Sequence, residues 1–366
     1  MLGPREVVPY LQARGYLTTS GAALDGITIE DASRRNTNLK VLRPRGMSYF
    51  LKQARDTDGA AHLAHEASIY QILRADVRRD SLGRCLPQFL GYDPNKHILV
   101  LEFVRKSHNL REHYALKRRF PVALGAAVAH ALAGLHRLPI KDDLVPRSSH
   151  GPPWIFSLHR PGLRHWRGLS STSLKVVEII QDRSEYCRLL NDVQQDWRND
   201  AFIHFDAKWD NCIVLELSAP EYTRGLRIID WELGGLGDAC WDVGSVLADY
   251  LSHWRSSVLH FDDRASEHPS IDVQCRLGRM QPAMRAFWTT YVRCMQHEPA
   301  FANDLLVRAA RFAAVRLLQI AVERAQISSE ITSSIVGNVQ LSLNILQRPI
   351  EAIVHLFGIR LSPSSR

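Results

Sequence analysis

Two short strings place carboxylates and an amide at spacings that suit metal-assisted phosphoryl transfer. Residues 204–211 read HFDAKWDN, and residues 228–230 read IID. Asp206 could accept or orient the proton of an attacking hydroxyl, while Asn211 and Asp230 could supply the oxygen ligands that magnesium prefers. Phosphoryl transfer needs little more from a protein than an oriented hydroxyl, held metal ions and neutralised negative charge. We therefore predict a phosphoryl-transfer site at these residues.

The sequence around the two strings decides between this interpretation and a plainer one. The pattern H-x-D-x-x-x-x-N of a kinase catalytic loop is short, and its residues could be a loop cap and two solvated polar groups. The apolar runs at 212–215 and 226–229 have the character of short strands, and residues 218–220 suit a hairpin loop between them. A loop, a strand, a turn and a strand that ends in Asp form the layout of a kinase site, so the context favours catalysis.

A lysine and a glutamate upstream complete the arrangement. Residues 48–52 form a β-prone run that ends in Lys52, and Glu66 lies in the helix-prone stretch 61–70. Kinases hold the ATP phosphates with a strand lysine that a helix glutamate positions. Taken alone, the pair could be two solvated surface residues; together with the downstream strings, they are predicted to bind nucleotide.

The remaining nucleotide contacts are predicted from two segments. Residues 30–38 lie between β-like runs without a glycine, so Ser33, Arg34 and backbone amides could bind phosphate, or the segment could be a plain polar hairpin turn. Residues 97–104 read as a buried strand that turns polar at 105. The backbones of Glu102 and Val104 are candidates for hydrogen bonds to adenine, and the alternative is a core strand without a ligand.

With these residues in place, the chain resembles the aminoglycoside phosphotransferase and choline kinase superfamily, the small-molecule branch of the protein-kinase-like fold. The resemblance runs from about residue 25 to 250 and rests on Lys52, Glu66 and the segments 101–103, 204–211, 229–232, 237–238 and 242–244. It implies ATP and Mg²⁺ as cofactors and Asp206 as the catalytic base. It also implies Asn211 and Asp230 as the magnesium ligands and Asp242 as a structural partner of the catalytic loop.

Two positions depart from the family pattern. Position 205 is Phe where the aminoglycoside enzymes usually carry Gly, and position 208 is Lys, as in Ser/Thr protein kinases. A cation two residues after the catalytic Asp could neutralise charge on the transferring phosphoryl group. We therefore predict Lys208 as a catalytic residue, with an ordinary solvated lysine as the alternative.

Four further segments resemble the stand-alone kinases of class V lanthipeptide and thioamide-peptide pathways. They are residues 153–161, 209–212, 279–282 and 341–349. The resemblance implies a Ser or Thr of a ribosomal precursor peptide as the acceptor and a separate lyase as a partner, while packing of the C-lobe explains these segments equally well. A small-molecule phosphotransferase is the alternative function, and an inactive kinase-like binding module is a third.

The predicted fold is α+β, a bilobal protein-kinase-like fold with a β-rich N-lobe and a mostly helical C-lobe. We expect an N-terminal helical extension at 1–24, a nucleotide-binding N-lobe at 25–103, a hinge at 104–110 and a C-lobe at 111–366 that carries the catalytic and metal loops and the acceptor site. Helices are predicted at 5–16, 121–138, 174–200, 279–297, 302–326 and 330–347. The Pro- and Trp-containing stretch 141–175 is predicted as an insertion or acceptor-binding loop.

Composition limits the partners. The six cysteines among 366 residues show no C-x-x-C spacing, so they read as reduced thiols, and we expect a cytoplasmic protein. No apolar run approaches the ~18 residues of a membrane span. The net charge of +8 does not suit the acidic site that a polycationic antibiotic would need. The arginines are dispersed, so we expect no nucleic-acid partner.

Overall fold

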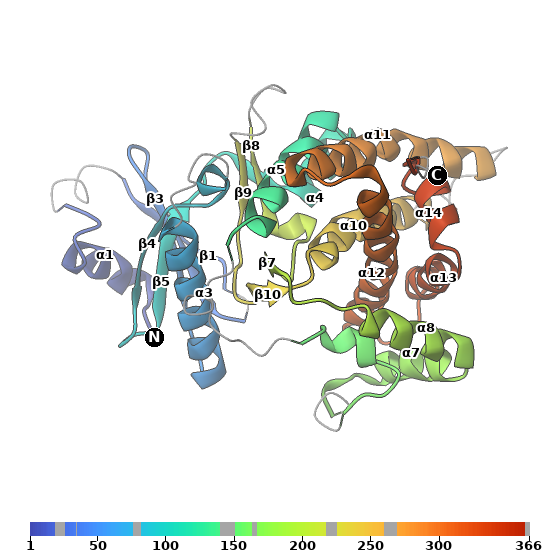
Figure 1. Ribbon diagram of the computed structural model, residues 1–366. Coiled ribbons are helices and arrows are strands. Elements are labelled where there is room, and N and C mark those ends of the chain that lie inside the picture. Colours follow the sequence, from blue (N-terminus) through green and yellow to red (C-terminus); the bar gives the residue numbers. More distant parts are fainter. Residues whose placement is uncertain are drawn as a thin grey trace.

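The structure is a computed structural model that describes residues 1–18, 26–33, 35–75, 82–139, 151–162, 167–216, 225–259 and 269–362. Figure 1 shows a sheet-containing part at one end of the molecule and a helical part at the other, with short strands between them. This confirms the predicted α+β architecture with two lobes.

The N-lobe contains a five-stranded antiparallel sheet in the order β1-β2-β3-β5-β4. Its strands are β1 Thr28–Asp31, β2 Thr37–Leu42, β3 Ser48–Gln53, β4 Phe89–Asp93 and β5 Ile98–Phe103. The predicted strands at 48–52 and 97–104 are thus β3 and β5.

Successive residues of a strand point to opposite faces of a sheet, and β5 shows this alternation clearly. Leu99 and Leu101 join the large core that includes helix α3 (Thr57–Ala75) and the C-lobe. Ile98 and Val100 join a second core on the other face of the sheet, beside helix α1 (Pro4–Ala13). Figure 1 shows α1 and α3 on opposite sides of the strands. The predicted N-terminal helix therefore packs directly on the sheet.

Two small sheets carry the loops of the candidate site. Strand β7 (Ala201–Ile203) pairs with β10 (Gly235–Gly237), and β8 (Cys212–Leu215) lies between β6 (Ser107–Asn109) and β9 (Leu226–Ile228). The sequence predicted β8 and β9, which lie in the apolar runs 212–215 and 226–229, but not β6, β7 and β10.

Helices build the rest of the C-lobe. They are α4 Leu110–Lys117, α5 Val122–His136, α7 Ser171–Gln181, α8 Ser184–Gln195, α10 Ala239–Leu259, α11 Pro269–Met295, α12 Pro299–Gln326, α13 Ser333–Gln347 and α14 Pro349–His355, with short 3₁₀ turns at Gly83–Cys85, Trp154–Ser157 and Trp209–Asn211. The helices predicted at 121–138, 279–297, 302–326 and 330–347 are confirmed as α5, α11, α12 and α13.

One prediction about the C-lobe needs correction. The segment 174–200 is not one helix, because α7 ends at Gln181 and α8 begins at Ser184. In the stretch 141–175, Ile155 and Phe156 are fully buried and the Phe156 ring lies 5.4 Å from the ring of Phe312, so this part packs on the C-lobe core, and its role as an insertion or acceptor-binding loop stays a prediction. Residues 140–150 and 163–166 of this stretch lie outside the described residues.

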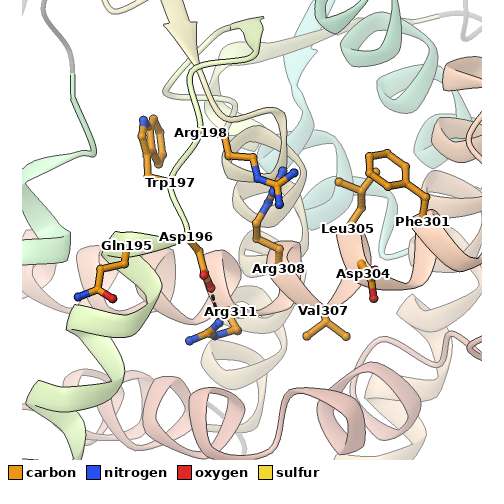
Figure 2. Close-up of a pocket in the computed structure, with 10 residues that line it drawn as sticks. All are labelled: Gln195, Asp196, Trp197, Arg198, Phe301, Asp304, Leu305, Val307, Arg308 and Arg311. Atoms are coloured by element: carbon orange, nitrogen blue, oxygen red, sulfur yellow. Dashed lines mark hydrogen bonds and ion pairs between the residues drawn. The ribbon is translucent and has the colours of Figure 1, made fainter.

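A pocket of about 390 Å³ opens between the α8–β7 connection and α12 (Figure 2). Arg311 pairs there with Asp196, and Arg308 pairs with the fully buried Asp238. None of the predicted site residues line this pocket. No helix in the described part of the chain is both long enough and apolar enough to cross a membrane.

Candidate functional site

The loop after β7 is held in place by hydrogen bonds from its backbone amides. The carboxylate of Asp242, on α10, accepts hydrogen bonds from the amides of His204 at 2.7 Å and Phe205 at 3.0 Å. The fully buried ring of His136 also contacts this carboxylate at 3.2 Å. Hydrogen bonds to a buried carboxylate on a neighbouring helix therefore determine the shape of the loop. Asp242 lies where the resemblance implies a structural partner of the catalytic loop.

Phe205 adopts a backbone conformation that a bulky residue rarely takes. Its φ is 66°, in the left-handed region that glycine tolerates best. Such a residue costs about 1–3 kcal/mol, so the surroundings must hold it. The Trp241 ring donates to its carbonyl at 2.7 Å, and the Phe205 ring packs 5.9 Å from that of Trp197. The Phe at this position is thus anchored on both its backbone and its ring.

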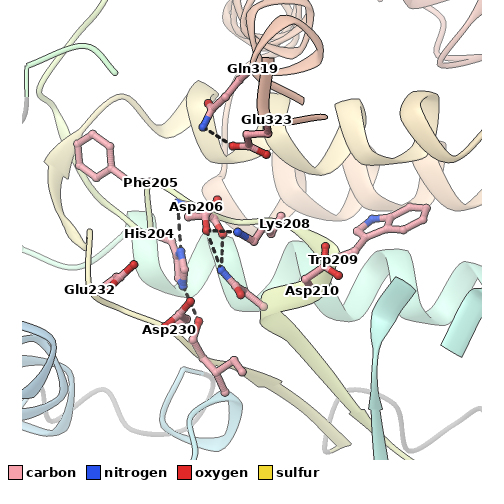
Figure 3. A network of polar contacts seen from close by, with 12 residues as sticks. His204, Phe205, Asp206, Lys208, Trp209, Asp210, Asp230, Glu232, Gln319 and Glu323 are labelled. Carbon is pink, nitrogen blue, oxygen red and sulfur yellow. Dashed lines mark hydrogen bonds and ion pairs between the residues drawn. The ribbon is translucent and has the colours of Figure 1, made fainter. Parts of the chain in front are cut away.

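Asp206 lies at the centre of a polar network that Figure 3 shows from close by. Its Oδ2 accepts from Asn211 Nδ2 at 3.1 Å and pairs with Lys208 Nζ at 2.6 Å. Its Oδ1 accepts from Arg316 Nη2 at 3.0 Å. Burial alone would lower the pKa of Lys208, but the Asp206 carboxylate raises it. The structure thus brings the predicted Asp206, Lys208 and Asn211 together.

The pairing of β8 with β9 brings Asn211 next to Asp230. The Ile229 amide donates to the Asn211 carbonyl at 3.0 Å, so Asp230 follows directly after this bond. The His204 ring contacts the Ile229 carbonyl at 2.9 Å, which ties the first loop to the second. Asp230 itself has a φ of 70°, a conformation that turns the chain sharply at the end of the strand.

Lys52 joins the two lobes at this site. Its ammonium contacts both carboxylate oxygens of Glu66 at 2.9 Å and Asp230 Oδ1 at 2.7 Å. Burial would lower the pKa of Lys52, but the carboxylates of Glu66 and Asp230 raise it well above its usual range. Burial would raise the pKa of Asp230, and Lys52 outweighs burial and lowers it. Lys52 and Asp230 are therefore a charged pair at neutral pH.

The loop between β1 and β2 lies near the same site, although its predicted residues are placed differently. The Ser33 hydroxyl accepts from the Asn38 amide at 3.1 Å, a bond that closes the hairpin. Arg34 lies outside the described residues. Its neighbour Arg35 contacts His62 on α3 at 2.9 Å and Glu232, two residues after Asp230, at 3.9 Å.

Hydrogen bonds at the end of β5 involve both residues that were predicted to contact adenine. The amide of Glu102 donates to the Gln88 carbonyl at 2.8 Å, and its side chain accepts from the Gln88 amide at 3.1 Å. The Val104 carbonyl accepts from the Ser107 hydroxyl at 2.7 Å. The first bond uses the Glu102 amide within the N-lobe, and the predicted contacts of Glu102 and Val104 with adenine stay predictions.

One residue of the network was missed by the sequence analysis. Arg316 lies on α12, 110 positions after Asp206, and its side chain is 2% exposed. A single arginine inside a long helix has no spacing signature. It closely follows an alanine-rich stretch, residues 309–314, and this was the available sign that it points into a packed interface.

The residues present can accommodate a magnesium ion. Among the described residues, no group of three or more His, Cys, Asp and Glu side chains gathers into a metal site. Magnesium in nucleotide-dependent enzymes is held by one or two protein ligands together with phosphate oxygens, so a larger cluster is not required. The Asp230 carboxylate and the Asn211 side-chain amide are hard oxygen donors on adjacent strand ends, which fits this requirement.

The sequence can be assigned to a known family of enzymes. The sequence matches the model of the phosphotransferase enzyme family over residues 28–270. The chain belongs to this family. It is therefore an ATP-dependent phosphotransferase whose acceptor is an alcohol group. A search of curated proteins found no match to the sequence.

Solved structures of this family share the fold. An ethanolamine kinase from Plasmodium vivax is 12% identical, with a TM-score of 0.58 and coverage of 95% of this chain and 90% of the other. A choline kinase from Cryptosporidium parvum is 11% identical, with a TM-score of 0.58 and coverage of 97% and 99%. At these identities the likeness shows the fold alone, and it confirms the kinase-like architecture.

Proposed function

We propose that this phosphotransferase moves the γ-phosphoryl group of ATP to a hydroxyl that is oriented by Asp206. The observation that carries the proposal is the three-way contact of Lys52 with Glu66 and Asp230, at 2.9 and 2.7 Å, beside the network around Asp206. This arrangement supports the proposal because phosphoryl transfer requires a phosphate-binding cation, a metal-binding carboxylate and a proton acceptor around one site.

Each side chain has a proposed task. Lys52 binds ATP phosphates and is held by Glu66, while the backbones of Glu102 and Val104 bind the adenine and the 30–38 loop with Ser33 covers the phosphates. Asp230 and Asn211 would hold Mg²⁺, which neutralises phosphate charge when it is bound. We assign these tasks to an N-lobe at 25–103, a hinge at 104–110 and a C-lobe at 111–366.

Asp206 and Lys208 serve the acceptor. Asp206 Oδ2 is within 2.6 Å of Lys208 Nζ and faces the same side as Asn211. We propose that Lys208 moves onto the transferring phosphoryl group when nucleotide binds, which frees Oδ2 for the proton of the acceptor hydroxyl.

The proposed acceptor is a small molecule with a free hydroxyl. Two structural relatives with this fold are kinases of ethanolamine and choline. The cations Lys208 and Arg316 contact Asp206, and the carboxylates near these cations include Asp230 and the half-exposed Glu323, 3.8 Å from Arg316. Cations and carboxylates are thus mixed here, which differs from the strongly acidic site that a polycationic antibiotic would need.

A second candidate acceptor is Ser or Thr of a ribosomal precursor peptide, with a partner lyase that acts on the phosphorylated product. The close Lys208–Asp206 pair favours it, because it matches the arrangement expected for kinases of protein hydroxyls. The segments of the peptide-kinase resemblance give less support. Leu343, Ile345 and Leu346 are buried, and the Gln281 side chain donates to the His355 carbonyl at 2.8 Å, so these residues pack the C-lobe.

Mass spectrometry can decide between the acceptors. The purified protein is incubated with magnesium-ATP and either a panel of amino alcohols and sugars or candidate precursor peptides, with Asp206→Asn as the inactive control. A gain of one phosphate on a small alcohol, absent in the control, supports the first acceptor, and the same gain on a peptide alone supports the second. If neither gains phosphate while ATP is also not hydrolysed, the proposed function is wrong.

A further inference from the structure

We propose that Arg316 is a positioning residue that holds the Asp206 carboxylate in its reactive orientation, so that helices α10 and α12 together clamp the catalytic loop. This inference rests on the proposed role of Asp206. It assigns a task to a buried arginine that the nucleotide and metal contacts do not use.

The first step is the burial of Arg316. Its side chain is 2% exposed on α12, whose other buried residues apart from Arg308 are alanine and large apolar residues. A buried charge is costly unless a partner of opposite charge compensates it. Asp206 Oδ1, at 3.0 Å, is the nearest carboxylate oxygen to Arg316 among the described residues, and Glu323 at 3.8 Å is half exposed. Burial would lower the pKa of Arg316, and Asp206 raises it.

The second step is which oxygen Arg316 occupies. It contacts Oδ1, whereas Lys208 and Asn211 contact Oδ2. A guanidinium is rigid and planar, so a contact on one oxygen fixes the rotation of the whole carboxylate. Oδ2 therefore stays directed at the position that Lys208 occupies and that the acceptor hydroxyl takes once Lys208 has moved onto the phosphoryl group. A shift of about 1 Å at such a group can change a rate about 100-fold.

The third step is the close packing of α10 against α12 near Arg316. Gly244 on α10 lies so close to α12 that an added Cβ would be 2.7 Å from the Ala309 carbonyl oxygen and 2.8 Å from the Ala313 amide. Arg316 follows Ala313 by about one helical turn, and Asp242 precedes Gly244 by two residues. One close helix crossing thus fixes both anchors of the catalytic loop, the carboxylate that binds its backbone and the guanidinium that binds its Asp.

Arg308 offers a matched control on the same helix. Its side chain is 10% exposed, and its Nη2 donates to Asp238 Oδ1 at 3.2 Å, much as Arg316 Nη2 donates to Asp206 at 3.0 Å. In both arginines the Nε is buried without a hydrogen-bond partner in the described structure. Removal of either guanidinium should therefore lower the unfolding temperature to a similar extent, but only one contacts Asp206.

The test compares Arg316→Gln, Arg316→Lys, Arg308→Gln, Asp206→Asn and the double variant Asp206→Asn/Arg316→Gln. Turnover is measured as release of inorganic phosphate from magnesium-ATP with water as the acceptor, so no acceptor need be known. We expect Arg316→Gln to lower kcat about 100-fold with little change in the KM for ATP. We expect Arg316→Lys, which keeps the charge and protects the fold, to lose about 10-fold. Arg308→Gln should keep kcat within about twofold.

The double variant separates positioning from a purely structural role. If Arg316 acts through Asp206, its substitution has no further effect once Asp206 is Asn, because groups that act as a unit are not additive. Two outcomes would overturn this inference and leave the proposed function intact. One is a kcat loss in the double variant that equals the product of the two single losses. The other is wild-type kcat in both Arg316 variants while Asp206→Asn is inactive. Wild-type turnover in Asp206→Asn would overturn the proposed function and the inference with it.

Discussion

At the scale of single residues, the contacts form two groups, to which we assign nucleotide binding and acceptor activation. Lys52 and Asp230 form one ion pair across the lobes, whereas Asp206 contacts Lys208, Asn211 and Arg316 on the C-lobe side. The two groups of contacts meet through the bond between the Ile229 amide and the Asn211 carbonyl. Substitutions in one group should therefore have effects that differ in kind from substitutions in the other.

We expect Asp206→Asn to lower kcat by at least about 100-fold and to leave the ATP dissociation constant unchanged, because general-base groups contribute about 10²–10⁴-fold. Lys52→Ala should instead weaken ATP binding, since it removes the cation from the phosphates and leaves Glu66 buried without its partner. Calorimetry of ATP binding and steady-state kinetics measure both. Loss of ATP binding in a folded Asp206→Asn protein would show that the roles are assigned wrongly.

Much of this site could be predicted from the sequence, because its residues lie at fixed short distances from one another in recognisable strings. Asp206 and Asn211 share one loop, and Asp230 lies two residues after β9, the strand that pairs with β8 behind Asn211. Arg316 could not be predicted, because its contact with Asp206 depends on how α12 packs in three dimensions. The Ser33 hydroxyl accepts a bond that closes the hairpin, and its predicted role as a phosphate ligand stays a prediction.

At the scale of elements, the crossing of α10 and α12 should tolerate very little added volume. We expect Gly244→Ala to destabilise the protein by about 1–3 kcal/mol, because the added methyl group meets backbone atoms of α12 that cannot rotate away. It should also lower kcat, since Asp242 and Arg316 both depend on this crossing. Chemical denaturation and phosphate release measure the two effects.

Gly278 on α11 is the control for that experiment. An added Cβ at Gly278 meets no atom within 4 Å, so Gly278→Ala should be neutral or should stabilise the helix by up to about 1 kcal/mol. Equal stability of the Gly244→Ala and Gly278→Ala proteins would show that the crossing is not close-packed in solution.

A histidine on α10 should make stability depend on pH. The His253 ring packs 5.5 Å from Trp209 and 5.6 Å from Phe120, and burial, aided by the Arg111 charge, lowers the pKa of His253 from 6.5 to about 4. Between these values the unfolded chain binds a proton at His253 that the folded protein does not bind. The folded state therefore loses stability as the pH falls through this window.

The size of this effect is limited by the solvent that still reaches the ring. We expect His253 to account for roughly 1 kcal/mol of the stability lost between pH 7 and pH 5, after allowance for screening. Denaturation of the wild type and of His253→Gln at both pH values measures it. Parallel losses in the two proteins would show that His253 does not carry the effect.

At the scale of the whole molecule, the sequence predicted the two lobes better than their details. Long amphipathic segments such as 302–326 and the β-prone run 48–52 carry strong periodic signals. The break between α7 and α8 and the burial of Ile155 and Phe156 were not predictable, because both are set by contacts with distant helices. The N-terminal helix was expected as an extension, yet it shares a core with the sheet, because its apolar side chains Val7 and Leu11 are fully buried there.

Contacts across the lobes determine what bound nucleotide should do to the whole molecule. Lys52 reaches Asp230 at 2.7 Å, the His65 ring contacts the Gly234 carbonyl at 2.8 Å, and Arg35 lies 3.9 Å from Glu232. A ligand that binds between these residues holds both lobes at once, so it must stabilise the folded protein as a unit. At a concentration of 100 times the dissociation constant, this stabilisation is about 2.7 kcal/mol.

We expect magnesium-ATP to raise the unfolding temperature by several degrees. ATP with a chelator should raise it less, because Asp230 contributes to nucleotide binding only through the metal. The Asp230→Asn protein should still fold. It should lose the magnesium-dependent part of the rise in unfolding temperature, and it should lose nearly all phosphoryl transfer. Asp304→Asn, a change at an exposed carboxylate beside the α12 pocket of Figure 2, should keep the full difference. Thermal denaturation of the three proteins measures this. An unchanged magnesium-dependent increment in Asp230→Asn would place the metal elsewhere, because the only charge removed is the one proposed to hold it.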